Sequence, residues 1–188
     1  DKAKESNMPN DNIARAIKKG TGELEGVTYS EHTYEGYAPG GVGLLVDVLT
    51  DNPNRTLPEI RNLLEKHGGS LASKGAVSFN FTEKGIVVFE PGVSEDQVME
   101  LAIDAGADDI QAQEDGSIEV SSAPADFEAV KKALAAAGLK PASAEVTRAP
   151  GVTVDVSGDS AEKLQVIVDA IEEHDDVQAV VHSGNFLE

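Results

Sequence analysis

The chain has 188 residues, of which 40% are hydrophobic and 26% charged, so it is long enough for one globular domain or two small ones and too apolar to be disordered. It contains no cysteine, which excludes disulfides, zinc–thiolate sites and thiol nucleophiles. It also has no apolar run of about 18 residues and no N-terminal signal pattern, so we expect a cytoplasmic protein without a membrane partner.

The net charge of −19 is distributed unevenly along the chain. Residues 1–82 contain 9 Lys or Arg and 11 Asp or Glu, whereas residues 83–188 contain 6 and 23. Such an acidic half repels phosphate backbones. Contacts with nucleic acid are therefore expected from the first half, while the second half has the composition of a solvated acidic surface.

The chain opens with a basic helical pattern. Ile17 follows Ile13 by one helical turn, and Arg15, Lys18 and Lys19 surround them, which predicts a short helix over residues 11–19. Because the sequence starts inside a helical pattern and without methionine, we expect it to be a fragment that lacks an N-terminal part.

Two strands are predicted next, over residues 28–37 and 42–49, with a glycine-rich turn between them. Pro39, Gly40 and Gly41 lead into a strand and not into a helix, and no Gly-Lys-Ser/Thr follows. The turn therefore lacks the features of a nucleotide phosphate loop. We interpret the segment as a β-hairpin whose turn needs glycine at positive φ.

A polar loop and a helix follow the hairpin. Thr56 and Glu59 have the spacing of a capping box with Thr56 as the N-cap, and apolar residues at 57, 60 and 64 predict one buried helical face. After the helix, Val77, Phe79 and Phe81 alternate with polar residues, which predicts a strand with one buried face.

The middle of the chain predicts the split-βαβ plait, βαββαβ. Asp115-Gly116 marks the turn of its central hairpin. The strands and helices are expected over residues 86–89, 94–105, 109–113, 117–121, 126–137 and 142–147.

The tail predicts a strand with Val152, Val154 and Val156, a helix with an apolar face at 164, 167, 168 and 171, and a strand over 177–181. Alone, neither this tail nor the first segment completes a domain. We therefore predict an α+β protein with two ferredoxin-like (split βαβ) antiparallel-sheet domains, one inserted in the other. The domains are residues 1–24 as the remnant of a helical region, 25–83 plus 151–188, and the inserted acidic 84–150.

The sequence shows no enzyme signature. None of His32, His67, His174 and His182 has a partner at i+3 or i+4, so each is interpreted as an isolated surface or turn histidine. The acidic run at 172–176 lacks the spacing of a calcium loop and is interpreted as a charged helix end. We expect no cofactor and no metal.

Ordered motifs along the whole chain resemble the YebC family of bacterial proteins, whose mitochondrial relatives activate translation of a cytochrome oxidase subunit. The matching motifs are Met8-Pro9-Asn10-Asp11-Asn12-Ile13, Arg15-Ala16-Ile17-Lys18-Lys19-Gly20-Thr21-Gly22, Tyr34-Glu35-Gly36-Tyr37, Pro39-Gly40-Gly41, Leu49-Thr50-Asp51-Asn52, Asn54-Arg55-Thr56, Lys66-His67-Gly68-Gly69 and Asp175-Asp176-Val177-Gln178. The chain departs from the family pattern at Asn10, where lysine is common, and at Ala38, where glycine is usual.

This resemblance implies a three-domain protein whose N-terminal basic helical domain is largely missing here. It also implies one of two functions, because the family is described both as DNA-binding transcriptional regulators and as translation factors that act on ribosomes stalled at sequences such as proline runs. Our first hypothesis is a non-enzymatic translation factor that contacts ribosomal RNA. The expected nucleic-acid-binding residues are Arg15, Lys18, Lys19, Tyr37, Pro39, Gly40, Gly41, Asn54, Arg55, Arg61 and Lys66.

Two alternatives stay open from the sequence. A DNA-binding regulator needs an element that reads base edges in a groove, and no helix carries Arg, Asn or Gln at such spacing. A protein- or small-molecule-binding module would use the acidic plait. Because this chain is acidic, we expect it to bind nucleic acid only weakly by itself. The oligomeric state is not indicated by any pattern.

Overall fold

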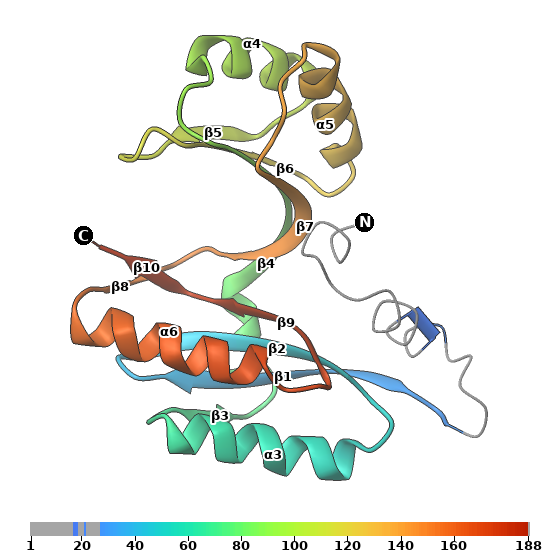
Figure 1. Ribbon diagram of the computed structural model, residues 1–188, viewed down its shortest axis with the longest axis vertical. Coiled ribbons are helices and arrows are strands. Elements are labelled where there is room, and N and C mark those ends of the chain that lie inside the picture. Colours follow the sequence, from blue (N-terminus) through green and yellow to red (C-terminus); the bar gives the residue numbers. More distant parts are fainter. Residues whose placement is uncertain (1–16, 19–20, 22–26, 188) are drawn as a thin grey trace. The chain divides into compact units, whose positions relative to one another are not determined.

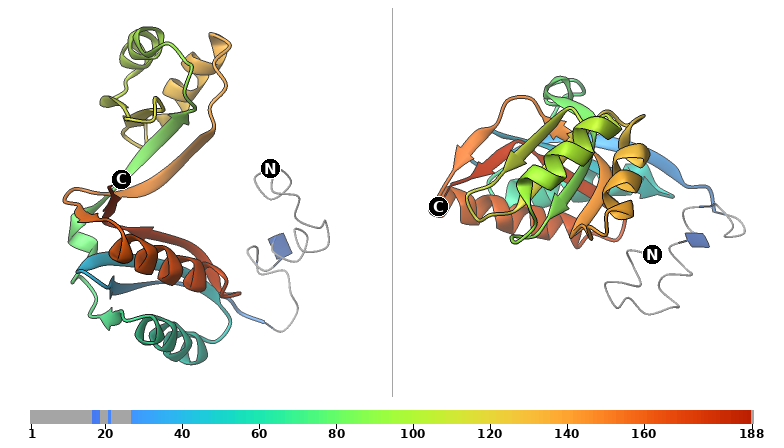
Figure 2. Two further views of the ribbon diagram at one scale, coloured as in Figure 1. Left: turned by 60° about the vertical axis from the view of Figure 1, so that its left-hand side comes forward. Right: turned by 90° about the horizontal axis from the view of Figure 1, so that it is seen from above.

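The computed structural model of the chain describes residues 17–18, 21 and 27–187, which form two compact units (Figures 1 and 2). The first unit contains the described residues up to Phe79 and those from Val152 onward, and the second contains Asn80–Gly151. The second unit therefore interrupts the first in sequence. Most of the expected helix over 11–19, including Arg15 and Lys19, lies outside the described residues, as does most of the segment 1–24.

The first unit is built on a four-stranded sheet in the order β3-β1-β2-β9. Strands β1 (Ser30–Ala38) and β2 (Val42–Thr50) form the expected hairpin, and all nine residues of each strand are paired with the other. Strand β3 (Ser70–Ala72) borders β1, and β9 (Val177–His182) borders β2, both antiparallel. Because β2 is central and covered on both faces, seven of its nine residues are buried.

Two helices cover one face of this sheet, α3 (Pro53–Lys66) and α6 (Asp159–Glu172). The apolar side chains at every second position of β2 pack against Ile60 and Leu64 of α3 and against the apolar face of α6. Figure 1 shows both helices running alongside β1 and β2. The core of this unit consists of Ala38, Val42, Leu44, Val46, Val48, Ile60, Leu64, Val156, Leu164, Ile167, Val168 and Ile171.

The start of α3 differs from the expectation, because the N-cap is Asn52 and not Thr56. The side chain of Asn52 accepts a hydrogen bond from the backbone N–H of Arg55 at 3.2 Å. Pro53 then fits the first helical position, where no N–H is needed. The helix therefore begins one turn earlier than the capping-box spacing predicted, and Thr56 is buried inside it.

The opposite face of the sheet is covered by residues 73–79, which we call the clamped segment. Its anchor is Glu35, which is only 5% exposed and whose carboxylate accepts hydrogen bonds from the backbone N–H groups of Gly75, Val77 and Ser78 at 2.5, 2.9 and 2.7 Å. Burial alone would raise the pKa of Glu35, but the three N–H donors outweigh it and hold the pKa below its ordinary value.

The clamped segment is not the predicted strand. Val77 is buried as expected, but Ser78–Asn80 form a single 3₁₀ turn, and Phe79 is 84% exposed. Alternation of apolar and polar residues suggested a strand, yet the backbone N–H groups of this segment bond to a carboxylate and not to a neighbouring strand. The following strand, β4 (Phe81–Phe89), consequently begins five residues before the expected 86–89.

Strand β8 (Val154–Val156) also departs from the expectation, since it does not join the four-stranded sheet. It pairs in parallel with β10 (Gly184–Phe186), a strand that the sequence pattern did not predict. Ser183 lies between the two sheets, because its N–H donates to Gly43 and its carbonyl accepts from Val154. The main sheet ends at β3 and β9, and β8 and β10 form a separate two-stranded sheet.

The second unit has the predicted βαββαβ order, with sheet order β5-β6-β4-β7. After β4, the elements of this unit are α4 (Glu95–Ala105), β5 (Asp109–Ala112), β6 (Ile118–Ser122), α5 (Phe127–Ala136) and β7 (Ser143–Pro150). Figure 1 shows α4 and α5 together on one side of the sheet.

No helix in the described part of the chain is both long and apolar enough to cross a membrane.

We predict that Glu35→Gln destabilises the protein by about 1 to 3 kcal/mol near pH 7, because an amide cannot accept from all three N–H groups. The pKa of Glu35 lies below 4.5 in the folded state, so its stabilising contribution is present above that pH and is lost as the pH falls through the folded value. Urea unfolding of both proteins at about pH 7 and about pH 3.5 measures this.

The stability difference between wild type and Glu35→Gln is therefore expected to shrink at acid pH. The matched control is Glu31→Gln on the same strand, where the residue is exposed and a change within about 0.5 kcal/mol is expected. A Glu35→Gln deficit that is the same at both pH values contradicts the role assigned to the ionised carboxylate.

Candidate nucleic-acid interface

The two glycines in the turn of the β1–β2 hairpin are exposed, and Pro39 is partly buried. Gly41 N–H donates to the carbonyl of Ala38 at 3.3 Å, with Pro39 and Gly40 between them, as in a type II turn. The φ angles of Gly40 and Gly41 are +87° and +81°, in the region that favours glycine. A Cβ on either glycine would meet no atom within 4 Å, so neither glycine packs against another part of the protein, whereas the Pro39 ring lies near Gly68.

Tyr37 and Lys66 lie at the same end of the first unit as this turn. Tyr37 is 37% exposed, pairs with Ser70 of β3, and donates its hydroxyl to the carbonyl of Ala76 at 3.4 Å. Lys66 is the last residue of α3, four residues before Ser70, and it is exposed. The structure thus brings Tyr37, the turn and Lys66 together.

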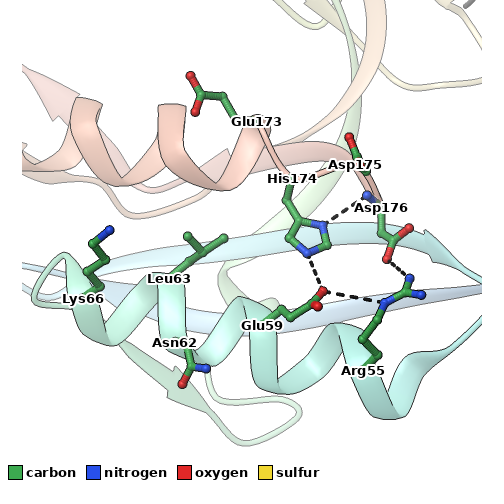
Figure 3. Close-up of a pocket in the computed structure, with 9 residues that line it drawn as sticks. All are labelled: Arg55, Glu59, Asn62, Leu63, Lys66, Glu173, His174, Asp175 and Asp176. Carbon is green, nitrogen blue, oxygen red and sulfur yellow. Dashed lines mark hydrogen bonds and ion pairs between the residues drawn. The ribbon is translucent and has the colours of Figure 1, made fainter.

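Arg55 lies in the first turn of α3, at the end away from Lys66 (Figure 3). Eleven residues of helix separate the two cations by roughly 16 Å. The guanidinium of Arg55 contacts three carboxylates: Asp176 at 2.8 Å, Asp51 at 3.3 Å and Glu59 at 3.8 Å. Its positive charge is therefore largely compensated within the protein, and the hydrogen bond to Asp176 raises the pKa of Arg55 above its ordinary value.

Asp176 is the partner that ties α3 to β9. It is 3% exposed, and its Oδ2 accepts from Arg55 and from the hydroxyl of Thr56 at 2.9 Å. Thr56 Oγ1 lies 2.7 Å from Thr50 Oγ1, which accepts from the N–H of Asn52 at 3.0 Å. The carboxylate and the Asn52 carbonyl, 3.1 Å from Thr56 Oγ1, only accept, so the Thr56 hydroxyl donates to one of them and accepts from Thr50.

His174 is not the isolated histidine that the sequence suggested. Its side chain is 15% exposed, its Nε2 lies 2.9 Å from Glu59, and its Nδ1 accepts from the N–H of Asp176 at 3.1 Å. An Nδ1 that accepts this N–H assigns the proton to Nε2, which donates to Glu59. A search for partners three or four residues away in the sequence could not find this pair, because Glu59 and His174 are 115 residues apart.

A pocket of about 760 Å³ opens between α3 and the turn that follows α6 (Figure 3). Ligand atoms of Glu59, His174 and Asp176 lie within 4.8 Å of one another there, a grouping that could hold a metal ion. Arg55 already pairs with two of these carboxylates, so the arrangement is that of a salt-bridge network. The pocket is lined by Arg55, Glu59, Asn62, Leu63, Lys66, Glu173, His174, Asp175 and Asp176.

The remaining predicted residues are dispersed. Asn54 and Arg61 are exposed on α3, and the helical period places Arg61 about 120° around the axis from Arg55. Lys18 is exposed, whereas Arg15 and Lys19 lie outside the described residues. Contact of any of these residues with nucleic acid stays a prediction.

The sequence did not indicate the two buried carboxylates, Glu35 and Asp176. Both belong to motifs that carried the family resemblance, but no local pattern indicated their partners. Asp176 bonds to Thr56, 120 residues away, and Glu35 to the clamped segment some 40 residues away. Pairings of this length follow from the fold and not from local spacing.

Known proteins similar to this chain cover nearly all of it. The family described as "TACO1/YebC second and third domain" matches residues 29–184. A protein of Paracidovorax citrulli named "Probable transcriptional regulatory protein" is 52% identical over 184 residues, which are 98% of this chain and 77% of that protein. A Thiobacillus denitrificans protein of the same name is 53% identical over 182 residues, 96% of this chain and 75% of its own length.

A solved structure is also similar. The crystal structure of a conserved hypothetical protein from Aquifex aeolicus superposes with a TM-score of 0.79 at 43% sequence identity. The match covers 99% of this chain and 77% of that one. The α+β fold described above is thus the fold of a solved relative.

We predict that Arg55→Ala destabilises the protein, because it removes a charged partner of the buried Asp176 carboxylate. Arg55 is half exposed, so water replaces part of the lost interaction. We expect calorimetry to measure a lower Tm for the variant. In a protein of this size, each kcal/mol of lost stability lowers Tm by roughly 2 to 4 °C. In a double-mutant cycle with Asp176→Asn, the two losses are expected to overlap by about 1 kcal/mol.

Arg61→Ala is the matched control for this measurement, since Arg61 is an exposed arginine on the same helix. Its effect is expected within about 0.5 kcal/mol. An Arg55→Ala protein as stable as the Arg61→Ala protein would show that the Asp176 network does not hold α3 to β9.

Proposed function

Because the chain belongs to the TACO1/YebC family, we propose that it is a non-enzymatic, cytoplasmic regulator of gene expression that acts on the ribosome by contacting ribosomal RNA. Relief of stalled ribosomes, for example at proline runs, is the action that the family resemblance implies. The contact surface we propose is the one around the β1–β2 turn.

The observation that carries this proposal is the distribution of acidic residues. In a chain with 34 Asp and Glu, segments 36–44, 66–79 and 180–184 are among those that contain none. They are neighbours in the structure, because Tyr37 pairs with Ser70 and Gly43 accepts a hydrogen bond from Ser183. We call these three segments the tip surface. It contains Lys66 and Lys74, both exposed.

An acid-free surface is what a protein of net charge −19 needs to approach a polyanion, since each carboxylate near a phosphate is repulsive. The turn adds a steric argument. A tip made of Pro39, Gly40 and Gly41 has no side chain beyond the proline ring, so its backbone can approach a crowded RNA surface closely.

A second candidate function is regulation of transcription through DNA, and the printed name of the bacterial relatives favours it. The geometry of the described helices favours it less. Helices α4 and α6 present mainly carboxylates, and Arg55 of α3 is paired with three of them. In-cell crosslinking that recovers either ribosomal RNA or DNA separates the two functions.

We predict that Gly40→Asn and Gly41→Asn weaken co-sedimentation with ribosomes, because each adds a side chain to the open tip. Asparagine tolerates positive φ better than other side chains, which keeps the expected stability loss at about 1 kcal/mol or less. The assay compares the pelleted fraction of each variant with wild type at a stated salt concentration near 0.1 M.

Gly138→Asn is the matched control. Gly138 has a φ of +78°, no atom within 4 Å of its Cβ position, and lies in the acidic second unit. It is expected to pellet with ribosomes like wild type. Equal pelleting of all three variants would remove the tip surface from the proposal.

A further inference from the structure

Phe79 is displayed on the surface by a backbone that is held in place. It is 84% exposed, a larger fraction than that of any other large hydrophobic residue in the described chain. A single exposed phenylalanine is ordinary on protein surfaces. What distinguishes Phe79 is that the N–H groups of the two residues before it, Val77 and Ser78, are bonded to a buried carboxylate.

The clamped segment fixes the position from which Phe79 projects. Ser78, the preceding residue, donates its N–H to Glu35 at 2.7 Å, and Val77 donates to the same carboxylate oxygen at 2.9 Å. The side chain of Val77 is 4% exposed and packs on Gly43, where a Cβ would lie 2.6 Å from its Cγ1. An aromatic ring on such a backbone is pre-organised, so little backbone entropy is lost when a ligand contacts it.

We propose that Phe79 is a stacking platform for an unpaired nucleobase, an inference that rests on the proposed function and adds the chemical group that is recognised. Every base has a π-face, so a phenylalanine ring can stack on any base, whatever the nucleic-acid sequence. A protein that contacts many different RNA sequences requires this tolerance. Bases inside a duplex are already stacked, so the ligand is single-stranded.

The charge around Phe79 supports a nucleic acid as the occupant. Phe79 ends the acid-free segment 66–79. Val77, two residues before it, packs next to Gly43 and Ser183, which belong to the other two segments of the tip surface. The nearby Glu35 carboxylate is buried and bonded to three N–H groups, so its oxygen atoms make no direct contact with a ligand. A phosphate backbone can therefore pass Phe79 without meeting an exposed carboxylate of these segments.

The test uses the absence of tryptophan from the chain. Phe79→Trp introduces a single fluorophore at the proposed platform, and stacking with a base is expected to quench its emission. The full chain is titrated with an unstructured RNA of about 12 nucleotides, with DNA of the same sequence, and with the blunt RNA duplex. We expect quenching by the RNA and weaker quenching or none by the duplex.

Ile103→Trp is the matched control, because Ile103 is 55% exposed on α4 of the acidic second unit. Its emission is expected to stay constant with every oligonucleotide. In a parallel anisotropy titration, Phe79→Ala and Phe79→Leu are expected to bind the labelled RNA roughly 5- to 100-fold more weakly than wild type, whereas Phe79→Trp binds at least as well.

Absence of quenching of Phe79→Trp, or equal RNA binding by wild type and Phe79→Ala, would overturn the proposal. An emission shift that depends on protein concentration and needs no nucleic acid would overturn it too, since Phe79 would then meet a second copy of the chain. Stronger quenching by DNA than by RNA keeps the stacking platform and assigns it to DNA.

The two proposals fail separately. If Phe79→Ala pellets with ribosomes like wild type and Phe79→Trp is not quenched, the stacking inference is wrong and the ribosomal function stands. If Phe79→Trp is quenched by single strands and wild type does not pellet with ribosomes, the ribosomal function is wrong and the stacking platform stands.

Discussion

The fold of the first unit depends on two buried carboxylates, those of Glu35 and Asp176. A buried carboxylate is tolerated only where donors replace its lost hydration. Glu35 receives three backbone N–H groups from the clamped segment, and Asp176 receives Arg55 and Thr56 from α3. Each carboxylate therefore fixes a part of the chain that regular secondary structure alone does not hold.

These two interactions have opposite consequences for the surface. Asp176, with Asp51 and Glu59, compensates the charge of Arg55. These ion pairs connect the first turn of α3 to the start of β9. Glu35 withdraws its own charge from solvent and leaves the sheet face beneath the turn without an exposed carboxylate of its own. In a strongly acidic protein, removing negative charge from a surface is as effective as adding positive charge, since repulsion from phosphates falls in both cases.

Both units are acidic. Residues 80–151 contain 14 Asp or Glu and 5 Lys or Arg, and the rest of the chain contains 20 and 10, with no acidic residue in the tip surface. The second unit keeps the plain βαββαβ arrangement around its own core, with Val87, Phe89 and Val98 fully buried. Its charge suits solvent or a cationic partner.

The sequence by itself determined the secondary elements whose apolar periodicity is regular, including the hairpin, helices α3 to α6 and the order of the second unit, because residues close in sequence create that periodicity. It also determined the family and the exposed turn, because Pro39-Gly40-Gly41 acts locally. Only the tertiary structure decided the roles of Arg55, Phe79 and His174. Arg55 and His174 are defined by partners more than 100 residues away, and Phe79 is exposed because Glu35 takes the N–H groups that a strand would use, so no local pattern could contain them.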